Sequence, residues 1–239
     1  MHPLHGVALS ADVAGVLGAR LGALISLDLP VAPGFILGTA AWHLCRLYGD
    51  GRHLPATVAE EVGRGLGELD HQVLAVRAAP AVQAVAPGPP RTTHPEQLEA
   101  VLGSMLGRAG VPTAVVVQAR SDAEGRPPSG HGRAFTRDPL RGTVWPTGEF
   151  RSGRSVMNLD AFCRWVPAAG VQLRAALAGA ESLHRSVCEV CFTIEAGRLW
   201  IDDARPVRHS RAAADRIAQA GLTEPARHVT PASAGGPGS

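Results

Sequence analysis

Lysine is missing from this chain of 239 residues, so all 23 of its basic residues are arginine. Enzymes that transfer phosphoryl groups commonly place a lysine ammonium on the phosphates, and this chain has none to offer. Arginine also binds phosphate, through two parallel hydrogen bonds, so the absence weakens nucleotide chemistry without excluding it. A GC-rich genome explains the bias toward arginine, alanine, glycine and proline at least as well as a functional cause does.

Strong charge of either sign and long apolar runs are also missing. A formal net charge of +2, with no basic run longer than two residues, gives no case for nucleic acid or an anionic membrane as partner. No apolar span approaches the ~20 residues of a membrane helix, and Asp12, Arg20 and Asp28 interrupt the first apolar stretch. We therefore expect a cytoplasmic protein with its four cysteines reduced.

Aromatic residues make up only 4% of the chain, but an apolar content of 45% is ample for a core. Helical and strand periodicities interleave, which predicts an α/β or α+β fold. The Pro-rich segment 78–93 predicts an ordered loop or linker, and the tail 223–239 is expected to be disordered. Helices are expected over 10–28, 40–48, 56–69, 95–106, 159–165, 170–186 and 211–220, and strands over 35–37, 73–77, 114–118, 133–137 and 190–204.

The segment 191–205 predicts two short strands around a tight Ala-Gly turn, with an arginine closing the second strand. Together with SRAAADRIA (210–218), which follows it, this hairpin is the last of four segments. The other three are GVLGARL to LPVAPGF (15–35), LAVRAA (74–79) and GHGRAFTRDP (130–139). In this order, from residue 15 to about 220, the four segments resemble the ATP-binding domain of pyruvate, phosphate dikinase and the related phosphoenolpyruvate synthases.

The resemblance implies an ATP-grasp-like domain with an N-terminal subdomain over 1–119 and a C-terminal subdomain over 120–222. Arg77 and Arg205 match arginines that face the phosphates of ATP in that family. Asp203 matches a glutamine that holds magnesium there, and as a carboxylate it could still do so. With Arg20, these three residues are the nucleotide-binding candidates, and Asp203 is also the candidate magnesium ligand.

Several departures from the family predict a loss of chemistry. Leu17 stands where the family has its ATP lysine, and Cys191 replaces a glutamate that holds magnesium. A neutral thiol is a poor ligand for a hard cation, and leucine cannot bind a phosphate. Only the Pro-rich loop and one helix connect the strand of Arg77 to the strand 114–118, so the helical subdomain that covers the nucleotide in the family is expected to be deleted.

The leading interpretation is therefore a degenerate domain without phosphotransfer, which binds ATP and magnesium weakly and serves a binding or regulatory role. Arg77 and Arg205 would then pair with acidic residues across the former cleft. Deletion of the cover is expected to bare an apolar surface, at which we predict self-association or a protein partner. The residues expected there are Val82, Ala84, Val85, Ala86, Pro87, Leu98, Val101, Leu102 and Leu106.

Two other interpretations stay open. In one, the chain is an active phosphotransferase that uses Arg20, Arg77, Asp203 and Arg205, with the acceptor domain supplied in trans. In the other, His184, Cys188 and Cys191 form a metal or thiol site, although two cysteines three apart on one strand point to opposite faces. The Gly130-x-Gly132 turn could cradle a phosphate with its backbone amides, and a simple turn between strands explains it equally well.

Overall fold

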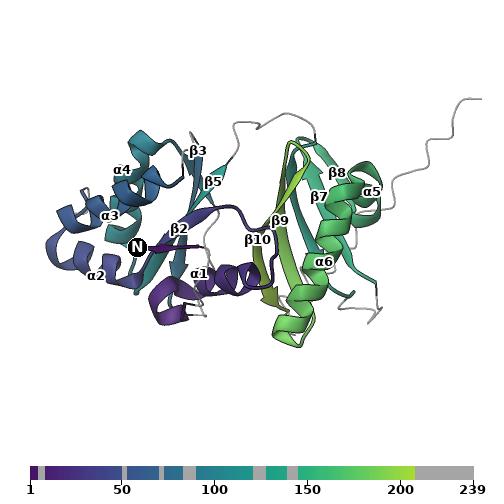
Figure 1. Cartoon of the computed structure of the whole chain (residues 1–239), viewed down its shortest axis with the longest axis horizontal. Helices are drawn as coiled ribbons and strands as arrows, with labels where there is room; N and C mark the ends of the chain where they lie inside the picture. The colour runs from purple at the N-terminus through teal and green to yellow at the C-terminus, as the bar shows by residue number, and fades with distance from the viewer. Residues whose placement is uncertain are drawn as a thin grey trace, which may run out of the picture.

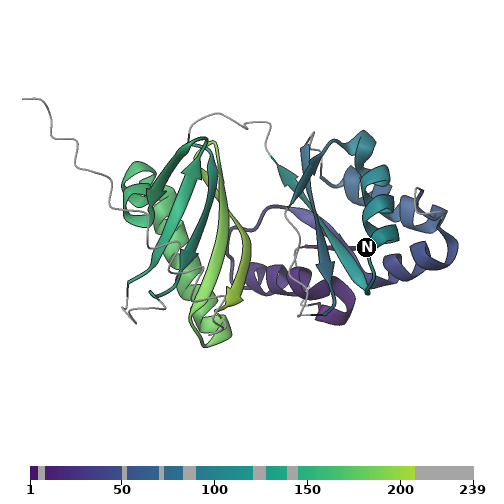
Figure 2. The ribbon, with the colours of Figure 1, turned by 180° about the vertical axis from the view of Figure 1, so that it is seen from behind.

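The computed structural model describes residues 1–4, 9–49, 53–69, 73–82, 90–120, 128–138 and 145–207. Within these residues the chain forms two lobes that lie side by side, each built on a five-stranded antiparallel sheet (Figures 1 and 2). The first lobe ends with residue 120 and the second begins at residue 128. The mixed helix and strand composition confirms the predicted fold class. In the described part of the chain, no helix combines the length and apolarity that crossing a membrane requires.

The sheet of the first lobe has the strand order β1-β2-β5-β3-β4. Three helices, with the short 3₁₀ turn η1 before the last, pack on its outer face (Figure 1). The alternation along the strands places Leu74, Val76, Val115 and Val117 against these helices. The strands are β1 (His2–Pro3), β2 (Gly34–Leu37), β3 (Val73–Pro80), β4 (Arg91–Thr93) and β5 (Thr113–Arg120), and the helices are α2 (Thr39–Tyr48), α3 (Ala56–Gly67), η1 (Pro95–Gln97) and α4 (Leu98–Arg108).

The sheet of the second lobe has the order β10-β9-β6-β7-β8, with two helices on its outer face (Figure 2). Its core holds the aromatic side chains of Phe150, Phe162 and Phe192, whose ring centroids lie 4.7 to 6.0 Å apart. The elements are β6 (Gly130–Phe135), β7 (Thr147–Ser152), β8 (Ser155–Asn158), α5 (Leu159–Trp165), α6 (Pro167–His184), β9 (Cys188–Glu195) and β10 (Arg198–Pro206).

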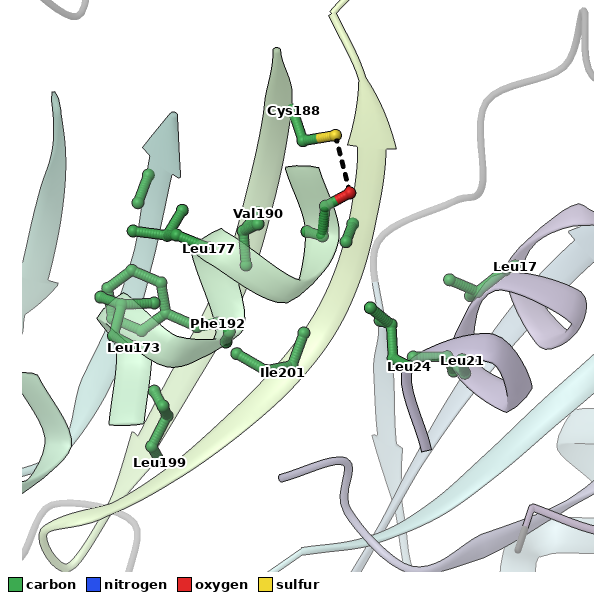
Figure 3. Close-up of a cluster of buried hydrophobic side chains, with 14 of the residues drawn as sticks. Leu17, Leu21, Leu24, Leu173, Leu177, Cys188, Val190, Phe192, Leu199 and Ile201 are labelled. Atoms are coloured by element: carbon green, nitrogen blue, oxygen red, sulfur yellow. Dashed lines mark hydrogen bonds between the residues drawn. The ribbon is translucent and has the colours of Figure 1, made fainter. Parts of the chain in front are cut away.

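Helix α1 (Ala11–Ile25) joins the two lobes along their lower edge in Figure 1. Leu17, Leu21 and Leu24 of this helix are fully buried in one apolar cluster that also contains residues of β9, β10 and α6 (Figure 3). The backbone N–H of Ile201 on β10 also donates to the carbonyl of Pro30, which follows α1, at 2.7 Å. The two lobes therefore share one core through α1.

The structure corrects several boundaries. Strand β3 extends to Pro80 and β4 covers 91–93, so the predicted loop over 78–93 is wrong at both ends, while 83–89 lie outside the described residues. Strands β7 and β8 were not predicted. The predicted helix 211–220 and the tail 223–239 lie outside the described residues.

The apolar surface expected on α4 is also wrong. Leu98, Leu102 and Leu106 are fully buried, because they form the stripe of α4 that packs against the sheet and α2. Val101 is partly buried against the same cluster. Val82 is 47% exposed, and residues 84–87 lie outside the described part. Helix α4 therefore does not form the exposed apolar surface on which the prediction of a protein partner was based.

Candidate functional site

A cavity of about 740 Å³ lies between the two sheets. Its first wall is the inner face of β3 and β5, opposite to the face that α4 covers. Its second wall is formed by β6, β7, β9 and β10. Along β9, the half-buried residues Glu189, Cys191, Thr193 and Glu195 line the cavity, because the residues between them point into the core under α6.

A β-bulge on β10 places two consecutive carboxylates on the cavity wall. The register with β9 shifts between Ile201 and Asp203, so that Asp202 is the extra residue. Ile201 points into the core, and strict alternation would turn Asp203 toward the same core. The bulge instead keeps Asp202 and Asp203 in the cavity and returns Ala204 to the core, which is the re-aiming effect that bulges have.

Ion pairs cross the cavity from the first lobe to Asp202. Arg120 Nη2 lies 2.7 Å from Asp202 Oδ1, and Arg77 Nη2 lies 3.4 Å from the same oxygen. Arg77 Nη1 also donates to the backbone carbonyl of Asp202 at 3.0 Å, and the Thr193 hydroxyl donates to Oδ2 at 2.5 Å. A second contact of Arg120 joins Nη1 to Glu195 Oε1 at 3.5 Å. Both lobes are thus connected by charge-assisted hydrogen bonds.

The remaining candidate residues are paired as well. Arg205 donates through Nε to Glu189 Oε2 at 2.9 Å, so both partners lie on the wall of the second lobe. Arg20 of α1 reaches both carboxylate oxygens of Asp203, at 3.2 and 3.1 Å. Every candidate arginine therefore has a carboxylate partner. Arg77, Asp203 and Arg205 line the cavity directly, whereas Arg20 is connected to it through its ion pair with Asp203.

Two residues that depart from the dikinase pattern lie in different environments. Leu17 is fully buried in the apolar cluster that α1 shares with the second lobe (Figure 3), and it is not among the residues that line the cavity. Cys191 lines the cavity, and the strand register places it opposite Asp203. Burial and the nearby Glu189 carboxylate raise the pKa of the Cys191 thiol to about 12. Its side chain is therefore a neutral thiol at physiological pH.

Other polar residues of the cavity were not predicted from the sequence. Arg120 ends β5, Glu189 lies two residues before Cys191, and Asp202 precedes Asp203. Glu149 of the unpredicted β7 pairs with Arg133 at 3.4 Å, and also with Arg151 at 3.2 Å. Alternation along β9 was a usable signal for Glu189, Thr193 and Glu195. No pattern in the sequence distinguished the two aspartates.

The predicted metal or thiol site is not formed. Cys188 Sγ points into the core, where it donates to the carbonyl of Ala180 at 3.4 Å (Figure 3), whereas Cys191 points into the cavity. Burial and nearby Arg20 lower the pKa of His184. Across the described ranges, no three His, Cys, Asp or Glu side chains gather closely enough to hold a metal ion. The opposite faces of β9 explain why the spacing of these residues does not make a site.

No protein-family model and no curated protein matches this chain. Solved structures do match. D-alanine–D-alanine ligase from Bacillus anthracis, solved with ATP, has a TM-score of 0.50 and 11% identity over 86% of this chain and 58% of its own. The synthetase PurK, solved with ADP, has a TM-score of 0.46 and 9% identity over 84% of this chain and 46% of its own.

A third match is the D-cycloserine synthetase DcsG, with a TM-score of 0.44 and 15% identity over 83% of this chain and 66% of its own. This chain thus spans 46 to 66% of the length of these three proteins. The likeness to the D-alanine–D-alanine ligase shows that the chain has an ATP-grasp fold. Identities this low show the fold alone and do not single out the dikinase family.

Proposed function

We propose that this chain is a nucleotide-binding domain of dikinase descent that has lost phosphoryl transfer and acts as a binding or regulatory protein. The observation that carries the proposal is the pairing of Arg77, Arg205 and Arg20 with carboxylates of the cavity itself. Descent is supported by the order of the resembling segments, and β9 and β10 form the hairpin that the resemblance implies.

A phosphate group that enters this cavity must displace a carboxylate from each arginine it contacts. Charge-assisted hydrogen bonds to phosphate and to carboxylate have comparable strength, so the exchange gains little. Each charged contact to a phosphate is typically worth about 1.5–3 kcal/mol. A cavity that has lost two such contacts therefore binds ATP more weakly by about two orders of magnitude or more. Five arginines and five carboxylates line the cavity, which therefore carries no excess positive charge to attract free ATP.

The donor set also fits magnesium poorly. Of the two positions that match magnesium ligands of the family, only Asp203 supplies a carboxylate, and Arg20 contacts both of its oxygens. The facing position holds the protonated thiol of Cys191, which offers a soft and neutral ligand to a hard cation. Magnesium would have to compete with the Arg20 guanidinium for Asp203, and the family glutamate that Cys191 replaces is not there to help hold the ion.

Titration calorimetry of the full chain with MgATP, together with an assay for ADP release, tests the proposal. We expect no binding in the low-micromolar range and no turnover. Cys191→Glu restores the family carboxylate, so its affinity for magnesium and MgATP should rise above that of the control Cys191→Ser. Low-micromolar affinity or ADP release by the unmodified chain would contradict the proposed loss of phosphoryl transfer.

One observation favours an active phosphotransferase as the second candidate. The cavity is large, and Arg120 and Arg133 supply two guanidinium groups beyond those in the family pattern. In this alternative, ATP replaces the internal ion pairs and a separate protein accepts the phosphoryl group. It requires tight MgATP binding that Arg77→Ala abolishes in the same calorimetric titration.

The binding role implies a protein partner or self-association, which stays a prediction. Light scattering of the full chain at increasing concentration measures self-association directly. Substitution of Leu102 is unsuited to this test, because Leu102 lies in the core of the first lobe and its change to a charged residue would unfold the lobe.

A further inference from the structure

We propose that Asp202 is an internal anion that latches the two lobes together and competes with anionic ligands for Arg77 and Arg120. The inference rests on the proposed function, because it identifies what holds the cavity in a state that excludes phosphate. It also assigns a ligand class to the cavity, namely oxyanions able to accept hydrogen bonds from two guanidinium groups at once.

The latch is built from both sides of the cavity. Arg77 and Arg120 come from the neighbouring strands β3 and β5 of the first lobe. The register pairs Arg120 with Val73, which lies on the same strand as Arg77. Asp202 comes from the bulge of β10 in the second lobe. One oxygen, Asp202 Oδ1, accepts a hydrogen bond from Arg120 at 2.7 Å and forms an ion pair with Arg77 at 3.4 Å, while Oδ2 accepts from Thr193 at 2.5 Å. Thr193 thus orients the carboxylate toward the two arginines.

These groups are largely removed from water. The side chains of Arg77 and Arg120 are each 10% exposed, and that of Asp202 is 7% exposed. Attraction between opposite charges is stronger in such a site than at the surface, and removal of one partner leaves the other buried without compensation. The bulge is the local feature that delivers Asp202 to this position, since it adds one residue to β10 at this point.

Arg77 retains a hydrogen-bond donor that Asp202 does not satisfy. Its Nε is buried and has no acceptor among the described residues, although Arg77 lines the cavity. Buried donors are nearly always paired in native proteins, so an unpaired one indicates a partner that the chain itself does not supply. An oxyanion with several oxygens, such as a phosphate chain, could accept from this donor and replace Asp202 at the other guanidinium nitrogens.

Asp202→Asn in the full chain tests the latch with inorganic tripolyphosphate as the probe. The amide keeps the size of the carboxylate but removes its charge. Arg77 then loses its ion pair and keeps the bond to the backbone carbonyl, while Arg120 keeps Glu195. We expect the variant to melt at a lower temperature than the unmodified chain. It should also bind tripolyphosphate about tenfold more tightly, because one additional charge-assisted contact becomes available to the ligand. Glu181→Gln is the matched control, because it removes the same charge from an ion pair with Arg137 outside the cavity.

A second variant covers the case in which Asp202→Asn does not fold. Thr193→Val removes only the hydroxyl that orients Asp202, and a smaller rise in tripolyphosphate affinity is expected from it. Adding Arg120→Gln to either variant should abolish the rise. Equal tripolyphosphate affinity in Thr193→Val, Glu181→Gln and the unmodified chain would overturn the latch. That result is independent of ATP turnover, which tests the proposed function instead.

Discussion

Asp202 and Asp203 are adjacent in the chain, yet they hold arginines from different elements. Asp202 binds the two arginines that enter from the sheet of the first lobe, whereas Asp203 binds Arg20 from helix α1. Because a bulge separates them in the register with β9, both carboxylates face the cavity without displacing the core residues around them. At the scale of single residues, the site is therefore a set of ion pairs that connect β3, β5 and α1 to β10.

The first prediction concerns Arg77. Replacement by alanine removes one of the two guanidinium groups on Asp202 Oδ1 and leaves a poorly exposed carboxylate undercompensated. Breaking a buried pair in this way typically costs about 3–5 kcal/mol, and the remaining contact from Arg120 places the expected cost near the lower value, about 3 kcal/mol. The free energy of unfolding, measured in urea, gives this cost.

Arg137→Ala is the control for Arg77→Ala. Arg137 pairs with Glu181, but its side chain is 48% exposed, and an exposed pair contributes less than about 1 kcal/mol. If the two variants lose equal stability, the ion pair of Arg77 is not the buried interaction described above.

The second prediction concerns pH. Burial raises the pKa of Cys188 to about 11, and burial together with Glu189 raises that of Cys191 to about 12, compared with 9.0 for an ordinary thiol. The folded chain therefore holds these protons more tightly than the unfolded chain. This stability is complete below pH 9.0 and is lost as the pH rises from there through about 11 to 12.

Cys191→Ser removes one of the thiols whose pKa is raised in the folded chain. The free energy of unfolding of this variant should fall less steeply above pH 9.0 than that of the unmodified chain, while the two curves run parallel below that pH. Chemical denaturation at a series of pH values measures both slopes. Parallel curves over the whole range would show that Cys191 titrates normally.

At the scale of elements, helix α1 contains a break at Gly15 that its packing requires. Gly15 has a φ of 67°, and a Cβ atom added there would lie 1.9 Å from the carbonyl oxygen of Ala79 on β3. The third prediction is that Gly15→Ala destabilises the chain by at least about 2 kcal/mol, because both the backbone conformation and the contact with β3 are lost.

Gly63→Ala provides the comparison for Gly15→Ala. Gly63 is exposed in the interior of α3, and an added Cβ would meet nothing within 4 Å. Since alanine favours a helix over glycine by about 0.8–1.0 kcal/mol, this variant should be more stable than the unmodified chain. Thermal unfolding of both variants separates a glycine that the fold requires from one that it does not.

The elements that the sequence predicted well are those with a dense apolar pattern. The valine-rich strand β5 and the alternating hairpin of β9 and β10 are buried on at least one face. The pattern of apolar residues along these strands can therefore be recognised in the sequence. Strands β7 and β8 lie toward the edge of their sheet, and β8 has no buried residue, so they carried almost no pattern. The same reasoning explains why Glu149 of β7 was missed.

The cavity was predictable in outline and not in its contacts. The hairpin of β9 and β10 was predicted from the sequence, but the pairing of Cys191 with Asp203 depends on the bulge. The bulge at Asp202 was not predictable, because a one-residue insertion leaves the local composition unchanged while it reverses the direction of every later side chain. The pairing of Arg120 with Asp202 joins residues 82 positions apart, and it depends on how the two lobes are placed.

At the scale of the whole molecule, α1 makes the two lobes into one folding unit. Leu21 lies in the middle of this helix, is fully buried, and belongs to the same apolar cluster as Phe192 and Leu177 of the second lobe (Figure 3). Val116 of the first lobe belongs to this cluster as well. The ion pairs of Asp202 with Arg77 and Arg120 add a second connection between the lobes. A lobe that unfolds alone would expose this shared core and leave the arginines unpaired.

The fourth prediction follows from this shared core. Calorimetry of the full chain should show one cooperative transition for both lobes, and Leu21→Ala should lower its midpoint at a cost of about 2–5 kcal/mol. Leu47→Ala is the matched control, because Leu47 is 72% exposed and its loss should change stability little. Hydrogen exchange should show Leu21→Ala weakening protection in β5 and in β9 by similar amounts, since both strands contribute to the cluster. Two separate transitions, or a loss of protection confined to one sheet, would mean that the lobes fold independently and that α1 belongs to only one of them.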